Sequence, residues 1–455
     1  DEIKTAYDNI YTFIKGSGQE FWMLDFAANT EVRSDNAYAG TTDLPVVSVE
    51  KNTQDASNSN ITRDWRNYLV GVARANVVIA NIDNITDTAL TETERKQWKA
   101  EAQILRAWMY YDMVRFWGEV PLIPAVNIPS ITSDNIDEVY PLLYPEKRHS
   151  VAEVYADIIA NLEAAVQNAP APQSGNKFLL SRAVANALLA KVYAEKPVRD
   201  YAKTIQYCDA VIADGFSLVA DYADLFQLNS TNTDAKLRNS SESIFEITYE
   251  GGGCWVGGIF GKNYTNPNST ISWRRWVCPS RDLIAAFDAE GDTVRKNQAI
   301  VYESVSYSNY YPADNYPFVY KFRSSSNSVI KLRLADILLM KAEALVATGD
   351  LSGAATLVNQ VRARVGLAAL PSSVTASADA MKTAVLKERR LELAFEGHRW
   401  FDLLRYDVAV ETMNTLNSRD SGRLAMKTMT EALTVYPIPQ SEIDKNPKLG
   451  QNPEY

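Results

Sequence analysis

Two stretches far apart in the chain repeat the same helical pattern. Residues 187–194 read Ala-Leu-Leu-Ala-Lys-Val-Tyr-Ala, and residues 337–344 read Ile-Leu-Leu-Met-Lys-Ala-Glu-Ala. After a short turn, each is followed by a second helical segment with small and apolar residues at matching places: Ala202, Ile205, Cys208, Ala210 and Ile212, against Ala355, Val358, Val361, Ala363 and Val365. Small side chains at such places allow neighbouring helices to pack closely. The chain therefore contains two helical hairpins of one design, and its fold must accommodate both.

Helical periodicity also extends over most of the remaining chain. Apolar residues recur with the helical period in roughly eight segments after an opening helix. These segments are 63–82, 91–117, 150–168, 178–195, 199–214, 331–347, 351–365 and 379–396. A pair of helices of about 34 residues with matched small residues is typical of the tetratricopeptide repeat. We therefore predict tetratricopeptide-like helices over residues 62–215 and 331–400, with an unrelated helical bundle as the alternative.

A loop-rich insertion, residues 216–330, separates the two matched hairpins. Residues 243–250 have the composition of a strand, while glycine, proline, asparagine, serine and tyrosine dominate much of the rest. An insertion of this size in a compact repeat array is more often functional than accidental. A second polar stretch, residues 27–60, is predicted to be a long surface excursion.

Charge and cysteine content argue against several classes of function. The chain has 46 Lys and Arg against 56 Asp and Glu, a net charge of −10, and no basic block, which disfavours a nucleic-acid partner. Its two histidines and three cysteines lack the spacing of a metal motif, so we expect neither a metal nor a cofactor. Whether Cys254 and Cys278 pair stays open. No stretch resembles the apolar run of about 18 residues that a spanning helix requires.

Three glutamates share one face of a predicted helix. Glu388, Glu392 and Glu396 are spaced four residues apart, and His398 follows them. Such a set could be an acid pair or a metal site, but charges on helices usually pair with neighbouring opposite charges. The partners we expect are Arg389, Arg390 and Arg399. Because common catalytic patterns such as GxSxG and HExxH are also absent, we predict that the protein is not an enzyme.

Four long segments, in order, resemble the hallmark motifs of the SusD/RagB family, surface lipoproteins of Gram-negative bacteria that capture glycans. The segments are Glu101–Leu122 (EAQILRAWMYYDMVRFWGEVPL), Leu334–Ala344 (LADILLMKAEA), Lys387–Arg405 (KERRLELAFEGHRWFDLLR), and the closing Tyr436–Pro447 (YPIPQSEIDKNP) with Gln451–Tyr455 (QNPEY). The resemblance covers nearly the whole chain and implies one SusD-like domain, residues 1–455.

The resemblance implies a fold, a location and partners. The fold is all-α, with four tetratricopeptide-like helical hairpins packed against a loop-rich irregular half that holds a few short strands. The location is the surface of the cell outer membrane, through export and a lipidated cysteine that we expect upstream of Asp1. The implied partners are an oligosaccharide ligand and a TonB-dependent transporter of the SusC type, to which the oligosaccharide is delivered.

Aromatic residues of the insertion are the main candidates for sugar binding. Aromatic side chains make up 10% of the chain. Sugar rings pack their C–H faces on flat aromatic rings, while their hydroxyls take directed hydrogen bonds. The candidates are Trp255, Tyr264, Trp273, Arg274 and Trp276. Trp273 and Trp276 are the strongest because they flank two arginines in a polar loop, and packing in the core is the alternative for each aromatic residue.

A segment near the N-terminus supplies further candidates. Residues 31–38 resemble the Ser-Asp segment of the family, which lies near the ligand face. On that resemblance we add Arg33, Asp35, Asn36 and Tyr38 to the predicted ligand-binding residues. The alternative role for Asp35 is to brace a turn, as aspartate commonly does.

A glycan-binding role has three competitors. The first is a repeat scaffold that binds only protein, which has no use for the aromatic insertion. The second is a binder of another nutrient, such as a peptide. The third is a glycoside hydrolase, which would need two carboxylates facing each other across a cleft.

Overall fold

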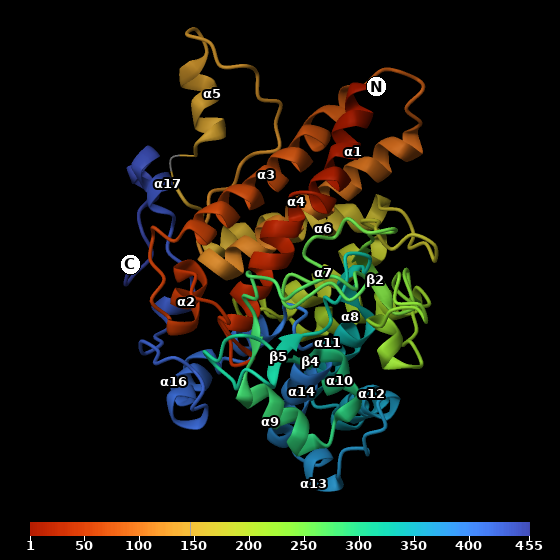
Figure 1. Ribbon diagram of the computed structural model, residues 1–455. Helices are drawn as coiled ribbons and strands as arrows, with labels where there is room; N and C mark the ends of the chain where they lie inside the picture. The colour runs from red at the N-terminus through yellow and green to blue at the C-terminus, as the bar shows by residue number, and fades with distance from the viewer. Residues whose placement is uncertain (146) are drawn as a thin grey trace.

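A stack of helices forms one half of the protein, seen in the computed structural model, which describes residues 1–145 and 147–455 (Figure 1). Each helix of the stack packs on the one before it, and α14 (Ala378–Glu392) packs on the last two. In order, the stacked helices are α1 (Glu2–Lys15), α3 (Ser59–Asn81), α4 (Glu92–Trp117), α6 (Val151–Asn168), α7 (Arg182–Ala194), α8 (Tyr201–Ala213), α11 (Leu334–Ala347) and α12 (Leu351–Arg364). The predicted tetratricopeptide-like arrangement is confirmed, and the hairpins matched in sequence are α7–α8 and α11–α12.

Local signals begin two of these helices where the sequence indicates. At the start of α4, the Thr91 hydroxyl accepts a hydrogen bond from the Glu94 backbone N–H, and the Glu94 carboxylate accepts one from the Thr91 N–H. Ser150 and Glu153 form the same capping box at α6. Close packing then depends on small residues: a Cβ at Gly71 of α3 would lie 2.8 Å from the Met109 sulfur of α4.

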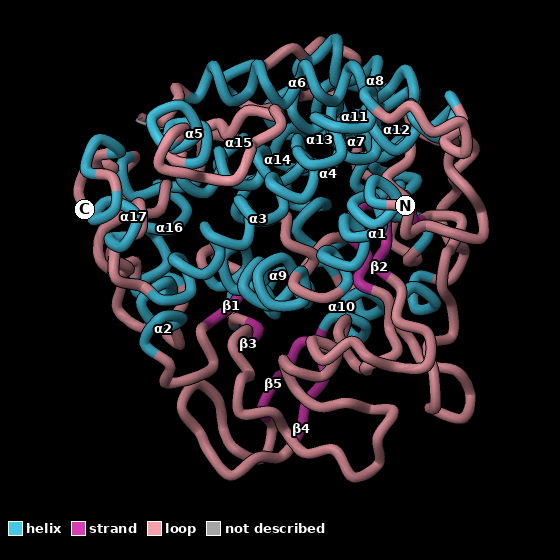
Figure 2. Tube along the Cα trace, turned by 90° about the horizontal axis from the view of Figure 1, so that it is seen from above, coloured by secondary structure: helices cyan, strands magenta, loops and turns pink. Residues whose placement is uncertain are grey.

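The other elements surround the stack. Figure 2 shows loops and short strands gathered on one side and helices on the other. The remaining helices are α2 (Leu44–Lys51), α5 (Ile136–Leu143), α9 (Arg281–Glu290), α10 (Thr293–Ala299), α13 (Ser372–Thr375), α15 (Arg399–Arg405), α16 (Ala409–Arg419) and α17 (Gln440–Lys445). Two of these, α9 and α10, were not expected inside the insertion. Ser280 and Asp292 cap them by accepting hydrogen bonds from the backbone N–H three residues on.

In the described residues, strands of the insertion take part in three two-stranded antiparallel sheets. The strands are β1 (Ala37–Tyr38) with β3 (Cys278–Pro279), β2 (Ser243–Ile247) with β6 (Val329–Arg333), and β4 (Ile300–Glu303) with β5 (Tyr316–Val319). The strand predicted at residues 243–250 is β2. Because β6 runs directly into α11, the β2–β6 pair holds the first part of the insertion beside the start of that helix.

The segment predicted as a surface excursion is largely interior. Residues 28–41 are buried and include the π-helix η2 (Ala28–Val32) and strand β1. Polar side chains can be buried when they are hydrogen-bonded. The prediction was wrong because polar composition alone cannot show that distant segments supply hydrogen-bond and ion-pair partners.

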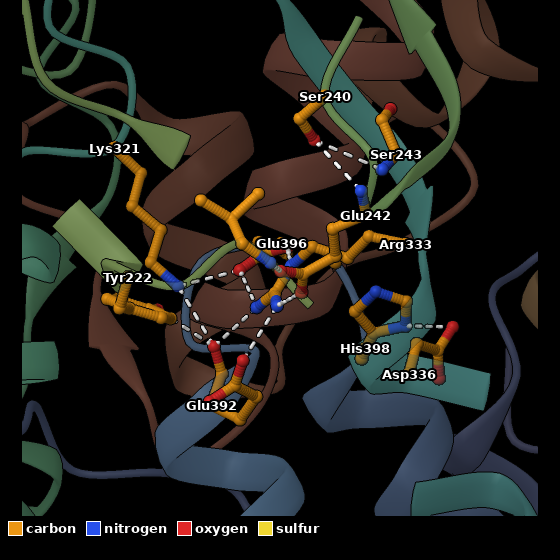
Figure 3. Close-up of polar contacts among 12 residues, drawn as sticks. Tyr222, Ser240, Glu242, Ser243, Lys321, Arg333, Asp336, Glu392, Glu396 and His398 are labelled. Atoms are coloured by element: carbon orange, nitrogen blue, oxygen red, sulfur yellow. Dashed lines mark hydrogen bonds and ion pairs between the residues drawn. The ribbon is translucent and has the colours of Figure 1, made fainter. Parts of the chain in front are cut away.

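A buried ion network joins the insertion to α14 (Figure 3). At its centre, Nη1 of Arg333 lies 2.8 Å from a Glu242 carboxylate oxygen and 2.7 Å from one of Glu392. Nε of Arg333 lies 2.8 Å from Glu396, which also pairs with Lys321 at 2.7 Å. The network includes Glu392, the last residue of α14, and Glu396, which lies in the turn after it, so the prediction that three glutamates share one helix face was wrong for Glu396.

The expected partners of those glutamates were wrong. Glu388 pairs with Arg295 and Arg362 instead of with arginines near it in sequence. Other acids bind the arginines that we expected as partners: Asp336 and Asp402 bind Arg389, Asp35 and Asp282 bind Arg390, and Asp35 binds Arg399. Ion pairing was the right principle, but the helix face is buried and meets distant segments.

The structure also shows the state of the cysteines and the character of the helices. Cys208, Cys254 and Cys278 are all buried free thiols. Within the described part of the chain, no helix combines the length and the apolar character needed to cross a membrane.

Candidate functional site

Three tryptophans of the insertion surround one arginine. The guanidinium carbon of Arg274 lies 4.9 Å from the ring centre of Trp273, 5.4 Å from that of Trp276 and 5.6 Å from that of Trp255. A guanidinium over an indole face at such distances is held by cation–π attraction. We call Trp255, Trp273, Arg274 and Trp276 the tryptophan cluster.

The members of the tryptophan cluster differ in exposure. Trp273 is 64% exposed and Trp255 is 41% exposed, whereas Trp276 is 5% exposed. The Trp276 indole N–H donates to Oδ2 of Asp43 at 2.6 Å, which fixes the ring in place. A buried tryptophan thus anchors the loop, and two indoles remain open to solvent. Large exposed aromatics that sit together usually mark an interaction site.

A π-helix from the N-terminal region supports the tryptophan cluster. In η1 (Gln19–Asp25), the Gln19 side chain accepts from the Trp255 backbone N–H at 2.8 Å and donates to the Gly253 carbonyl at 3.2 Å. Glu20 of the same element lies 3.8 Å from Arg274 and 3.2 Å from Arg63 of α3. Rare π-helical turns occur frequently at functional sites. Contacts through η1 therefore connect the two exposed indoles to the helical stack.

The glycines before the cluster serve close backbone packing. A Cβ at Gly257 would lie 1.7 Å from the Ser324 carbonyl oxygen, and Gly258 has φ +92°. Only glycine fits both places without strain. The glycine-rich run thus packs two backbone segments together.

Two family models match this chain at its two ends. The model described as "Starch-binding associating with outer membrane" matches residues 2–194, and the model described as "SusD family" matches residues 305–455. The SusD-like protein P38 of Formosa agariphila is similar over 100% of this chain and 90% of its own length, at 28% identity. The chain belongs to the SusD family.

Other similar proteins share the fold over most of their length. The starch-binding protein SusD of Bacteroides thetaiotaomicron is 24% identical over 80% of this chain and 74% of its own. Surface glycan-binding protein A from Bacteroides thetaiotaomicron, solved in complex with laminarihexaose, superposes with a TM-score of 0.80. That superposition covers 99% of both chains at 20% identity, and so shows a common fold.

The N-terminal candidates of this SusD-family chain lie in its interior. Arg33, Asp35, Asn36 and Tyr38 are each 3% exposed or less. Arg33 stacks 3.8 Å from the ring centre of Tyr436, and Asn36 donates to the Glu31 carboxylate. A side chain with no open surface cannot contact a ligand, so the structure corrects this part of the predicted site.

Asp35 and Tyr38 brace the interior. Both Asp35 carboxylate oxygens accept from Arg399 at 2.8 Å, and the Tyr38 hydroxyl donates to Asp420 at 2.6 Å. Burial would raise the pKa of Asp35, but Arg390 and Arg399 outweigh it and hold that pKa well below its usual range. Asp35 therefore stays charged at neutral pH and braces the interior, which is close to the turn-bracing role that the sequence suggested.

Tyr264 is the other candidate that the tryptophan cluster does not include. Its hydroxyl donates to Glu303 at 2.5 Å, and its ring meets Tyr320 edge-on with centres 5.2 Å apart. Nζ of Lys262 lies 4.9 Å from the same ring centre. Because Glu303, Tyr320 and Lys262 already contact the Tyr264 side chain, we leave Tyr264 out of the proposed contact surface.

Sequence reasoning missed the residues that support the cluster. Gln19, Glu20 and Asp43 contact the tryptophan cluster, and Arg63 pairs with Glu20, although each lies far from the cluster in sequence. No periodicity or motif connects them to the cluster. The only available signal was that a polar, partly exposed loop with three tryptophans needs anchors somewhere.

The site offers surfaces for binding and shows no metal centre. Within the described residues, no group of three or more His, Cys, Asp or Glu side chains is placed to hold a metal ion. The two exposed indoles and the arginine between them can stack on a ring and donate hydrogen bonds.

Proposed function

We propose that this chain is a non-catalytic glycan-binding protein whose contact surface is the tryptophan cluster. The main support for this proposal is that Trp273 is 64% exposed and lies beside Arg274, which also contacts Trp255. An exposed indole costs solvation free energy unless a partner covers it, and the C–H face of a sugar ring is a fitting partner. Two similar proteins, a starch-binding protein and a surface glycan-binding protein solved in complex with laminarihexaose, support a glycan as ligand.

Trp273→Ala is expected to weaken binding of an oligosaccharide at least tenfold, about 1.4 kcal/mol, because central aromatic anchors dominate small interfaces. The measurement is isothermal calorimetry with neutral and charged oligosaccharides. Tyr140→Ala is the matched control, since Tyr140 is a 44% exposed aromatic on α5, outside the cluster. The melting temperature of Trp273→Ala should stay near that of the native protein.

The outcomes separate the competing functions. Equal affinity of native protein and Trp273→Ala for a confirmed oligosaccharide would overturn this contact surface. If no glycan bound while a peptide or a protein partner did, the glycan function itself would be wrong.

The second part of the proposal concerns place and partner. We propose a lipid anchor upstream of Asp1, exposure on the outer-membrane surface, and delivery of bound oligosaccharide to a TonB-dependent transporter of the SusC type. The family description "associating with outer membrane" supports the location. Protease added to intact cells should digest the full-length protein, and mild detergent should extract it together with the transporter. Protection from protease would contradict surface exposure.

A further inference from the structure

The guanidinium of Arg274 occupies the middle of the proposed contact surface. It lies within 5.6 Å of all three indole ring centres of the cluster, and its side chain is 26% exposed. A sugar ring stacked on Trp273 or Trp255 would therefore place its substituents beside this guanidinium.

The hydrogen-bond donors of Arg274 are unused by the protein. A guanidinium has five N–H donors, and the Arg274 side chain makes no hydrogen bond to the described residues. The acid paired with it, Glu20, lies 3.8 Å away, beyond hydrogen-bond length. That carboxylate is closer to Arg63, at 3.2 Å. Two buried arginines, Arg333 and Arg399, by contrast donate hydrogen bonds to carboxylates.

A second arginine in the same loop packs on an aromatic ring. Arg275 lays its guanidinium 3.6 Å from the ring centre of Tyr307, and the described residues offer it no ion pair. Its Nε is buried without a hydrogen-bond partner. The nearby acid Asp43 instead accepts from the Trp276 indole. Among the described residues, the two neighbouring arginines thus have one ion pair between them, the 3.8 Å contact of Arg274 with Glu20.

We infer that the sugar unit bound at the tryptophan cluster carries an anionic group, a carboxylate or a sulfate, which Arg274 binds. This inference rests on the proposed function and names its substrate class. A planar guanidinium donates two parallel hydrogen bonds to such an anion, and these charge-assisted bonds are about twice as strong as neutral ones. The indoles beside it contact the ring that carries the anion.

Matched pairs of probes test the inference by calorimetry. Pectic oligosaccharides with free carboxyl groups are compared with their methyl esters, and carrageenan oligosaccharides are compared before and after desulfation. We expect at least one charged form to bind tenfold or more tightly than its uncharged counterpart. The pair that shows the preference identifies the anion. Salt should weaken binding of the charged form because it screens exposed charges.

Variants then assign the preference to Arg274. In Arg274→Gln the preference for the charged form should fall below threefold, together with its salt dependence. Arg274→Lys, which keeps the charge without the planar fork, should retain part of the preference. Arg74→Gln, which removes an exposed arginine of α3, is the matched control and should bind as the native protein does. The melting temperature of each variant shows whether the fold is intact.

The alternative outcomes are distinct. Equal affinity for charged and uncharged forms, or a preference unchanged in Arg274→Gln, would overturn the anion inference and leave the proposed glycan function standing. Absence of binding to every probe and to neutral glycans would overturn both.

Discussion

Arg333→Met is expected to lower the free energy of unfolding by about 3 to 5 kcal/mol. Arg333 is 1% exposed and is shared by Glu242, Glu392 and Glu396. Methionine is of similar length but leaves these carboxylates short of a cation in the interior. Because the network joins β6 to the end of α14, its loss also loosens the insertion from the helical stack (Figure 3).

Urea denaturation of the native and variant proteins measures this loss. Arg74→Met, at an exposed site on α3, is the control and should change stability by less than about 0.5 kcal/mol. A change below about 1 kcal/mol in Arg333→Met would show that the network does not support the fold.

The same network makes the free energy of unfolding depend on pH in the acid range. Burial raises the pKa of Glu396, but Arg333 and Lys321 outweigh it and lower the pKa to about 2, against 4.5 ordinarily. A carboxylate with a lowered folded-state pKa stabilises above its unfolded value and loses that contribution as pH falls from about 4.5 toward 2. Arg333→Met should therefore show a flatter decline over this window. An unchanged slope would show that Arg333 does not hold the Glu396 pKa down.

Asp35→Asn is expected to cost about 3 to 5 kcal/mol of stability while leaving glycan affinity unchanged. Asp35 is 1% exposed, accepts two 2.8 Å hydrogen bonds from Arg399, and lies 3.3 Å from Arg390. Asparagine keeps the shape but leaves the buried guanidinium of Arg399 without its carboxylate, while Arg390 keeps only Asp282. An amide also presents N–H donors to an arginine, which adds repulsion.

Denaturation and calorimetry together check this expectation. The control is Asp407→Asn, which removes the acid of an exposed pair with Lys196 and should change stability by less than about 1 kcal/mol. If folded Asp35→Asn kept normal stability but lost glycan affinity, Asp35 would belong to the ligand site after all. The experiment thus decides whether Asp35 braces the interior or contacts the ligand.

Some of the site could be predicted from sequence because it is local. Trp273, Arg274 and Trp276 are neighbours in the chain, so a polar loop rich in tryptophan already indicated an aromatic surface. Which ring would be open could not be predicted: Trp273 is 64% exposed, whereas Trp276 is 5% exposed because it reaches Asp43. That contact joins residues 233 positions apart, beyond any local pattern.

The N-terminal candidates failed for the same physical reason. The polar segment holding Asp35 suggests a surface loop, because isolated charges are costly to bury. Arg390 and Arg399 come from the far end of the chain and remove that cost. Likewise, Glu392 faces arginines from other elements rather than its sequence neighbours.

The sequence by itself determined the helical stack, since amphipathic period, small residues and capping boxes act within a few turns of each helix. It also determined the family, because four ordered motifs survive in the linear chain. Only the tertiary structure decided which charges are buried and which indoles are open. Exposure and ion pairing depend on what distant segments bring to a side chain, and that is a property of packing.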